Sequence, residues 1–148
     1  MLFQKNKDFD IIKAIKKTNN QILKQENEIV RKYDLTSSQY GVLECIYLKG
    51  EMCINELIER QISTSGTMTV IVKNLEKKKY ITKKSSIEDK RYFKIGLTNQ
   101  GKALVEKILP ERKKQLNDFT SIFTEDEKDD LLNILYKVKR RYNEVKDE

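Results

Sequence analysis

The sequence predicts a mainly α fold that contains one small β-hairpin. Apolar residues recur at helical spacing along most of the 148 residues, and one stretch near residues 81–97 changes to the alternation of strands. The chain has a single proline and no tryptophan. Its charged residues (36%) nearly equal its hydrophobic residues (38%), which favours helices with narrow apolar stripes over one large enclosed core.

The first three predicted helices follow from periodicity and capping signals. Residues 8–33 form a long amphipathic helix. Thr36 and Gln39 form a capping box that opens a second helix, and Gly50 is its expected C-terminal cap. A third short helix covers residues 54–60. The apolar residues of the first helix are Phe9, Ile12, Ile15, Ile22, Leu23, Ile29, Val30 and Tyr33.

A fourth helix, near residues 64–78, has two chemically different sides. On a wheel of about 100° per residue, the apolar side holds Met68, Ile71, Val72 and Leu75. The opposite side is small, hydroxylic and basic, and could approach a groove closely. It holds Gly66, Val70, Lys73 and Lys77, flanked by Thr67, Thr69 and Asn74.

After this helix the pattern changes to a period of about two residues. Ile81 stands among polar residues, and Phe93, Ile95 and Leu97 alternate with their neighbours. These are two strands joined by residues 85–90, with one packed face and one wet face. Thr98 begins another helix, whose regular part Pro110 should kink or end. A second capping box, Thr124 to Glu127, starts the last helix.

The order of elements within residues 36–97 is that of a winged helix-turn-helix lobe. The outer segments, residues 8–33 and 98–146, carry more apolar surface than a module of this size can cover alone. The chain, residues 1–148, is therefore expected to form one winged lobe with a helical dimerisation layer built from both ends.

Charge is concentrated in this lobe. Residues 61–95 hold nine Lys or Arg against three acidic residues, which is nearly all of the formal net charge of +7. A basic helix joined to a basic hairpin suits a protein that reads DNA, because cations hold phosphates while short side chains reach base edges. Lysines near a helix C-terminus also interact favourably with the helix dipole, so the positive charge alone does not establish DNA binding.

Catalysis and membrane insertion are not expected. The chain has no histidine, which excludes histidine-ligand metal sites and Ser-His or Cys-His pairs, and its five glycines are scattered. We predict no enzyme activity, no cofactor and no metal. The first ten residues lack a signal-peptide run, and no stretch approaches the roughly 18 apolar residues of a membrane span. Cytoplasmic location is the expectation.

The two cysteines could be redox-reactive, but an inert structural thiol is the simpler explanation for each. Cys45 lies in an apolar run, where a buried inert thiol is the usual outcome. Cys53 lies at a helix start, where the helix dipole could lower the pKa of its thiol. The two do not form a C-x-x-C pair.

Six short motifs occur in a fixed order over residues 35–101. They are Leu35-Thr36-x-x-Gln39-Tyr40-x-x-Leu43, Ser65-Gly66-Thr67-x-Thr69, Leu75-Glu76-Lys77-Lys78, Tyr80-Ile81-Thr82-Lys83, Asp89-Lys90-Arg91 and Leu97-Thr98-x-x-Gly101. Each motif alone is weak. In this order and at these distances, the chain resembles the MarR family of multiple-antibiotic-resistance regulators.

The resemblance implies a homodimer that binds palindromic double-stranded DNA and represses transcription until a small phenolic, quinone or oxidant effector releases it. Two-fold symmetry implies half-sites about 34–36 Å apart. The wing arginine of the family falls on Arg91, which would enter the minor groove, and Asp89 would hold the wing turn. The expected DNA-binding residues are Ser65, Gly66, Thr67, Thr69, Val70, Lys73, Asn74, Lys77, Lys83, Lys84, Lys90 and Arg91.

Two further features bear on regulation. Tyr40, Ile12 and Ile15 could line a pocket for a small aromatic effector, although Tyr40 and the apolar residues of the first two helices are more simply core. The reactive cysteine of peroxide-sensing members corresponds here to Ile12, so that sensing mode is not expected. Lys79 also stands where the family commonly has glycine.

Two other classes of function stay open at this point. A lysine-rich face also suits a non-specific architectural DNA-binding protein, because lysines grip phosphates without reading bases. A winged helix can also serve as a protein-interaction module, for which the basic face would be dispensable.

Overall fold

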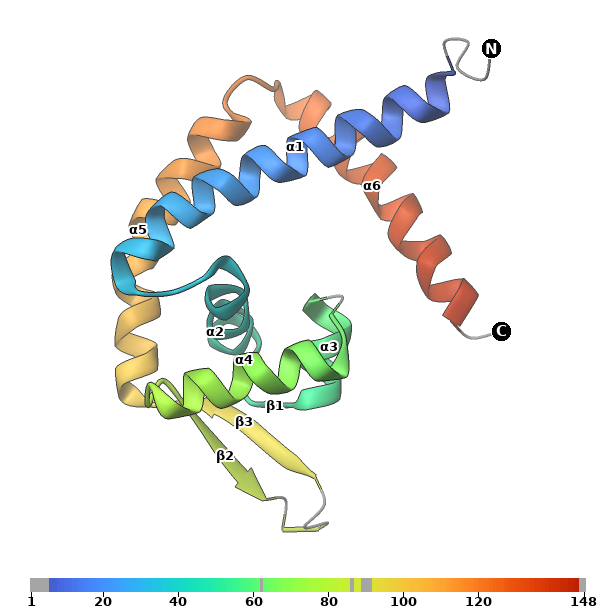
Figure 1. Cartoon of the computed structure of the whole chain (residues 1–148). Coiled ribbons are helices and arrows are strands. Elements are labelled where there is room, and N and C mark those ends of the chain that lie inside the picture. Colours follow the sequence, from blue (N-terminus) through green and yellow to red (C-terminus); the bar gives the residue numbers. More distant parts are fainter. Residues whose placement is uncertain (1–5, 62, 86, 89–91, 147–148) are drawn as a thin grey trace. The chain divides into compact units, whose positions relative to one another are not determined.

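The computed structural model describes residues 6–61, 63–85, 87–88 and 92–146. It is mainly α with one small antiparallel sheet, which confirms the predicted fold class (Figure 1). In chain order the elements are α1 (Lys7–Val30), the 3-10 helix η1 (Arg31–Tyr33), α2 (Ser37–Lys49), β1 (Met52–Cys53), α3 (Ile54–Gln61), α4 (Ser65–Lys77), β2 (Ile81–Ser85), β3 (Phe93–Leu97), α5 (Asn99–Thr120) and α6 (Glu125–Lys146). None of the described helices combines the length and apolar content needed to cross a membrane.

The chain divides into two compact units, Met1–Arg112 and Lys113–Glu148. The first unit contains α1 to β3 and the first part of α5. The second contains the rest of α5 and all of α6. The boundary between the two units lies inside α5.

The predicted helix boundaries at α2 and α6 are confirmed by their hydrogen bonds. The Gln39 backbone N–H donates to Thr36 Oγ1 at 3.1 Å, and the Thr36 backbone N–H donates to Gln39 Oε1 at 3.0 Å. Thr124 and Glu127 repeat this exchange at the start of α6. Gly50 caps the C-terminus of α2 with φ of 88°, a conformation that favours glycine.

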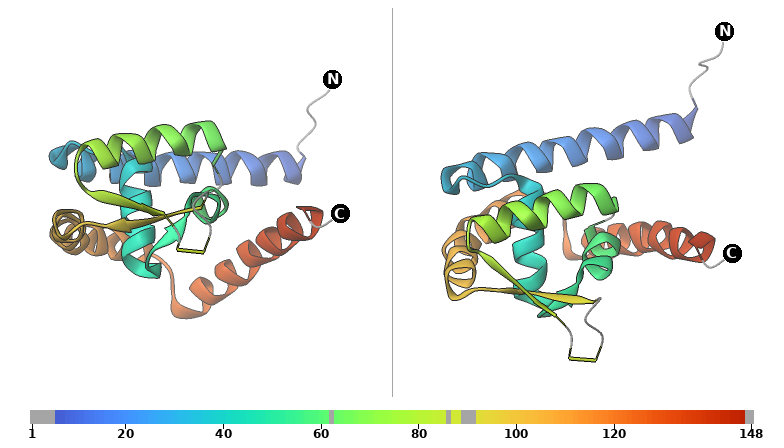
Figure 2. Two further views of the ribbon diagram at one scale, coloured as in Figure 1. Left: turned by 90° about the horizontal axis from the view of Figure 1, so that it is seen from below. Right: turned by 60° about the horizontal axis from the view of Figure 1, so that its bottom comes forward.

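The sheet has one more strand than the sequence predicts. Its order is β1-β3-β2, and β1 pairs antiparallel with β3 through Met52 opposite Ile95 and Cys53 opposite Lys94. The two predicted strands are confirmed as β2 and β3, whereas β1 was not predicted because a two-residue strand is too short to show a period. Figures 1 and 2 show the β2–β3 hairpin extending away from the helices of its unit.

Most of the predicted hairpin faces are correct, but Phe93 is an exception. Ile81 and Ile95 are buried on the inner face, as expected. Phe93 shares that face with them but lies near the far end of the strands, beyond the core, and is 48% exposed. The alternating pattern shows which face a residue is on, but not how far along the strand the core extends.

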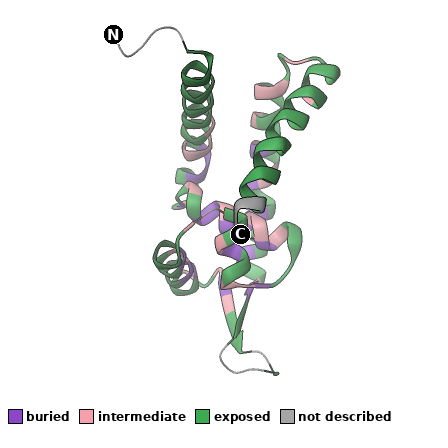
Figure 3. Cartoon of the chain, turned by 90° about the vertical axis from the view of Figure 1, so that its right-hand side faces the viewer, coloured by how far each residue is buried: buried purple, intermediate pink, exposed green. Residues whose placement is uncertain are grey.

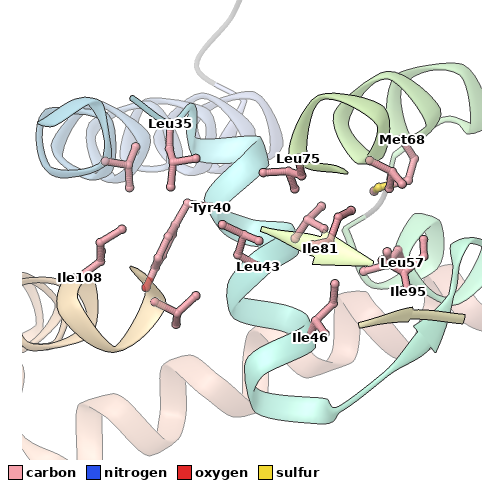
Figure 4. Packing of buried hydrophobic residues seen from close by; sticks show 14 of the residues in the cluster. Leu35, Tyr40, Leu43, Ile46, Leu57, Met68, Leu75, Ile81, Ile95 and Ile108 are labelled. Carbon is pink, nitrogen blue, oxygen red and sulfur yellow. The ribbon is translucent and has the colours of Figure 1, made fainter. Parts of the chain in front are cut away.

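A single hydrophobic core holds the first unit together (Figure 4). α2 contributes Tyr40, Leu43 and Ile46, and the other elements pack around it. Each fully buried aliphatic side chain contributes about 1.5–3 kcal/mol relative to exposure. The remaining core residues are Ile29, Val30, Leu35, Val42, Met52, Leu57, Met68, Val72, Leu75, Ile81, Ile95, Val105 and Ile108.

Pro110 does not end its helix. α5 runs without a break from Asn99 to Thr120, with Pro110 inside it, so of the two expectations, a kink or an end, the end was wrong and the kink stays a prediction. Proline removes one backbone donor. Ile108 and Arg112, on either side of Pro110, are both buried.

Most residues of α1 and most residues of α6 are exposed (Figure 3). In α1 only Ile29 and Val30 are buried, and the exposed residues of its first half include Phe9, Ile11, Ile12 and Ile15. Separately, the described part of α6 contains no buried residue; its exposed apolar side chains are Leu131, Leu132, Ile134, Leu135, Tyr136, Val138 and Tyr142. Apolar patches of this kind on soluble proteins usually mark interaction surfaces.

Candidate nucleic-acid interface

The two sides of α4 divide as the sequence predicts. Met68, Val72 and Leu75 are fully buried and Ile71 is half-buried. The residues expected to meet DNA are all exposed: Ser65, Gly66, Thr67, Thr69, Val70, Lys73, Asn74 and Lys77. Their placement on one exposed face agrees with the predicted wheel, and their contact with DNA stays a prediction.

The start of α4 is fixed by hydroxyl groups. Thr64 is the N-cap, and its Oγ1 accepts the backbone N–H of Thr67 at 3.2 Å. The Thr64 hydroxyl also donates to Thr67 Oγ1 at 2.9 Å. One turn further on, the Thr69 hydroxyl donates to the carbonyl of Ser65 at 2.8 Å. These bonds orient the threonine side chains on the exposed face.

The end of α4 is a left-handed turn at Lys79, whose φ is 63°. The Lys79 N–H donates to the Glu76 carbonyl at 2.9 Å, and the Tyr80 N–H donates to the Leu75 carbonyl at 3.0 Å. This pair of bonds is a Schellman motif, which glycine normally completes. Lysine therefore adopts here the backbone conformation that a glycine would favour, and the turn leads directly into β2.

A second left-handed turn at Asp34 lies beside the first. Asp34 has φ of 56° and ends η1. The Lys78 ammonium donates to the Asp34 carboxylate at 2.8 Å and also to the Asp34 carbonyl. Lys78 thus joins the end of α4 to the end of η1, and its charge is directed at Asp34. Sequence reasoning missed this contact because the two residues are 44 positions apart.

The hairpin places like charges opposite each other. Lys84 on β2 is the direct partner of Lys94 on β3, so both side chains lie on the same face. Like charges directly opposite in a sheet are destabilising. Among the described residues, Glu51 lies 3.5 Å from the Lys84 ammonium and Glu56 interacts electrostatically with Lys94, so part of this charge is balanced. Such a pair suits a surface that meets a polyanion.

Lys83 belongs to the other face of the hairpin. Its ammonium lies 3.9 Å from the carboxylate of Glu76 on α4. The contact ties the start of the hairpin to the exposed face of α4. The predicted wing residues Asp89, Lys90 and Arg91 lie outside the described residues, so their roles stay predictions.

The residues proposed for an effector pocket do not share one environment. Tyr40 is completely buried in the core, whereas Ile12 and Ile15 are about half exposed on α1. The Tyr40 hydroxyl donates to Glu44 at 3.1 Å, and its ring lies 5.9 Å from the guanidinium carbon of Arg112. Burial, reinforced by the negative charge of Glu44, raises the pKa of the Tyr40 hydroxyl well above its usual range.

A buried ion pair beside Tyr40 was not anticipated from the sequence. Arg112 on α5 and Glu26 on α1 approach to 2.5 Å, and their side chains are only 6% and 14% exposed. The pair links α1 to α5 next to α2. Removing one partner of such a pair is costly because it leaves the other charge buried.

Both cysteines are half-buried. The Cys45 thiol lies 3.9 Å from the sulfur of Met52. The Cys53 backbone N–H donates to the carboxylate of Glu56 at 2.9 Å, and this bond lowers the pKa of the Glu56 carboxyl. Among the described residues, no three His, Cys, Asp or Glu side chains are grouped so that they could hold a metal ion.

Comparison with known proteins places this geometry in context. The family model described as "Transcriptional regulator SarA/Rot" matches residues 24–108. The HTH-type transcriptional regulator SarZ of Staphylococcus aureus (strain USA300) is 35% identical over 118 residues, which cover 80% of this chain and 78% of SarZ.

Solved structures share the fold. A MarR protein from Peptoclostridium difficile aligns with a TM-score of 0.85 and 21% identity, over 96% of this chain and 92% of its own. A mutant MarR from E. coli in complex with operator DNA aligns with a TM-score of 0.81 and 25% identity, over 90% of this chain and 96% of its own. The S. aureus MepR–DNA complex aligns with a TM-score of 0.80 and 22% identity, over 87% of this chain and 95% of its own.

Proposed function

The chain belongs to the SarA/Rot family of MarR-like winged-helix transcriptional regulators, which are not enzymes, and from this we propose that it is a homodimer that binds palindromic DNA sequence-specifically. In this proposal α4 lies in the major groove and the wing reaches the adjacent minor groove. Two relatives of the same fold are described in complex with DNA, MepR and the E. coli MarR mutant. The dimer would place two copies of α4 about 34–36 Å apart, one turn of DNA.

The exposed side of α4 is the observation that carries the proposal. It is free of bulky side chains near its start, where Gly66 has open space around it, and it carries Lys73 and Lys77 toward its end. Lys84 and Lys94, directly opposite each other, add positive charge on the hairpin that follows. Small residues let the helix enter a groove while flanking lysines hold the phosphates on both sides.

The proposal assigns roles by chemistry. Lys73, Lys77, Lys83 and Lys84 hold phosphates, and Lys90 and Arg91 act at the wing. Ser65, Thr67, Thr69, Val70 and Asn74 face base edges, and Gly66 allows close approach. Asp89 supports the wing turn.

The direct test is selection from a randomised duplex library, followed by affinity measurement against scrambled duplex. The expected result is one enriched palindromic sequence that binds at least about a thousandfold tighter than the scrambled control. Equal affinity for both duplexes would reject sequence-specific regulation. It would instead favour the non-specific architectural role that a lysine-rich face also suits.

Salt dependence tests the lysine assignment. Lys73→Ala should reduce the slope of log K against log salt by about one unit per lost phosphate contact, hence about two units for a symmetric dimer. Lys17→Ala removes the same charge from the side of α1 away from its apolar stripe and should leave the slope unchanged. Equal slopes for Lys73→Ala and the native protein would place that lysine off the DNA. A fully active charge-reversed Lys73/Lys77 variant would favour a protein-interaction module.

We extend the proposal to repression relieved by a small aromatic or oxidising effector, which the MarR resemblance supports. Tyr40, Arg112 and Glu26 provide a polar group where α1, α2 and α5 meet. Thermal-shift screening of phenols, quinones and oxidants is the test. A ligand present at about 100 times its Kd stabilises the native state by about 2.7 kcal/mol. Stabilisation without loss of DNA affinity would argue against release by that ligand.

A further inference from the structure

The part of α4 that would enter the groove is apolar at its centre. Val70 is 59% exposed, although valine is usually a core residue, and Met68 and Val72 on either side of it are buried. Its neighbours one turn away are Gly66 on one side and Lys73 on the other. Because a helical side chain leans toward the helix N-terminus, Val70 leans toward Gly66, where nothing lies within 4 Å of the position that a Cβ would take.

Two of the hydroxyl protons near Val70, those of Thr69 and Thr64, are already used within the helix start. Thr69 donates its proton to the Ser65 carbonyl, and Thr64 donates its proton to Thr67 Oγ1. A threonine hydroxyl has one proton, so Thr69 has none left to donate to guanine O6 or N7. The methyl group of Thr69 is the part of the side chain that can make an apolar contact.

Only one base offers an apolar group on its major-groove edge. Thymine carries a C5-methyl group there, whereas adenine, guanine and cytosine show hydrogen-bonding groups. Val70 and the Thr69 methyl can therefore distinguish thymine by contact, while Lys73 and Lys77 on the same face hold the backbone.

We propose that Val70, supported by the methyl group of Thr69, recognises a thymine methyl in each half-site of the operator. This inference rests on the proposed sequence-specific DNA binding and names the chemistry of its central contact. The Thr69 hydroxyl donates within the helix, to the Ser65 carbonyl, and leaves the contact with DNA to the methyl group.

The test uses the enriched duplex from the library, with each thymine replaced in turn by deoxyuridine. This replacement removes only the C5-methyl group. At one thymine per half-site, the native protein should lose about fourfold in affinity, the value of one buried methyl contact. Val70→Ala should bind the unmodified duplex more weakly than the native protein does. Its affinity should fall no further when deoxyuridine replaces that thymine.

A matched pair at position 69 separates the methyl from the hydroxyl. Thr69→Ser keeps the hydroxyl and loses the methyl, so it should weaken binding. Thr69→Val keeps the methyl and loses the hydroxyl, so it should bind as the native protein does. Circular dichroism confirms that each variant is folded, as expected for exposed positions.

The outcomes are distinct. If no duplex is enriched, the proposed sequence-specific function fails, and this inference fails with it. If a duplex is enriched but no deoxyuridine position discriminates native protein from Val70→Ala, only this inference is overturned. If Thr69→Val is the weaker of the pair, the hydroxyl and not the methyl makes the contact, and the inference is likewise overturned.

Discussion

At the scale of single residues, Lys79 shows a local cost that the chain accepts at the junction between α4 and β2. It holds φ of 63° inside a Schellman motif. A side chain with a Cβ pays about 1–2 kcal/mol in this left-handed region, which glycine does not.

We therefore expect Lys79→Gly to stabilise the protein by about 0.5–1 kcal/mol, after allowing for the greater freedom of glycine in the unfolded chain. Urea unfolding followed by circular dichroism measures the gain. Lys79→Ala removes the same charge but keeps a Cβ, so it should show no such gain. If alanine stabilises as much as glycine, charge and not backbone strain is the cause.

Tyr40 makes stability depend on alkaline pH. Burial, aided by Glu44, raises the pKa of its hydroxyl in the folded state above the ordinary value of 10.0. The unfolded chain therefore loses this proton first as pH rises, and stability falls. The contribution of the Tyr40 hydroxyl to the free energy of unfolding is complete below pH 10. Above pH 10 it falls by up to about 1.4 kcal/mol per pH unit.

The measurement compares native protein with Tyr40→Phe in urea unfolding between pH 8 and about pH 11. The other tyrosines and the lysines titrate in both proteins, so the difference isolates Tyr40. The variant should have the flatter dependence above pH 10. Parallel curves would mean that the Tyr40 hydroxyl is not shielded in the native state.

At the scale of elements, the junction between the hairpin and α5 depends on Gly101. Thr98 caps α5 by accepting the Gly101 N–H at 2.9 Å, and the Thr98 N–H donates to the Tyr80 carbonyl at 3.1 Å. A Cβ on Gly101 would lie 2.0 Å from that same carbonyl oxygen. Backbone atoms cannot yield as a flexible side chain does.

Gly101→Ala should therefore destabilise the protein by at least about 2 kcal/mol. Gly66→Ala is the matched control, since a Cβ there meets nothing within 4 Å and alanine favours helix. Thermal unfolding in the absence of DNA compares the two. A Gly101→Ala protein as stable as the control would show that the Tyr80 turn moves freely.

The elements also show what can be predicted from sequence and what cannot. The two sides of α4 and the capping boxes at Thr36 and Thr124 were predictable because helical period and capping are local. β1 was not, because a two-residue strand is defined by its partner β3 and not by its own pattern. The Lys78–Asp34 contact likewise joins residues that only the fold brings together.

The candidate site divides in the same way. The exposure of Val70 and Lys73 followed from the wheel, whereas the internal bonds of the Thr64 and Thr69 hydroxyls depend on side-chain rotamers that no spacing reveals. Pro110 predicted an end or a kink from its local effect on the backbone, and α5 does not end there.

At the scale of the whole molecule, the exposed apolar residues of the terminal helices imply a partner, and the proposed homodimer supplies one. Ile12→Asp on α1 or Leu135→Asp on α6 should place a charge in that interface and give monomers with much weaker DNA binding. Sedimentation velocity measures the oligomeric state. Lys17→Asp, on the opposite side of α1 from Ile12, should stay dimeric. Dimers in all three variants would locate the interface elsewhere.

The order of the sheet gives its lysines a further importance. β3 lies between β1 and β2, so β2 is one of the two edge strands of this sheet. An exposed strand edge can pair with another chain and start aggregation, and charged side chains such as Lys83 and Lys84 are a common protection. Under the proposed function, DNA binding and protection against aggregation therefore depend on the same two side chains. A variant that loses both lysines needs its aggregation state measured before its weaker binding is attributed to DNA contacts.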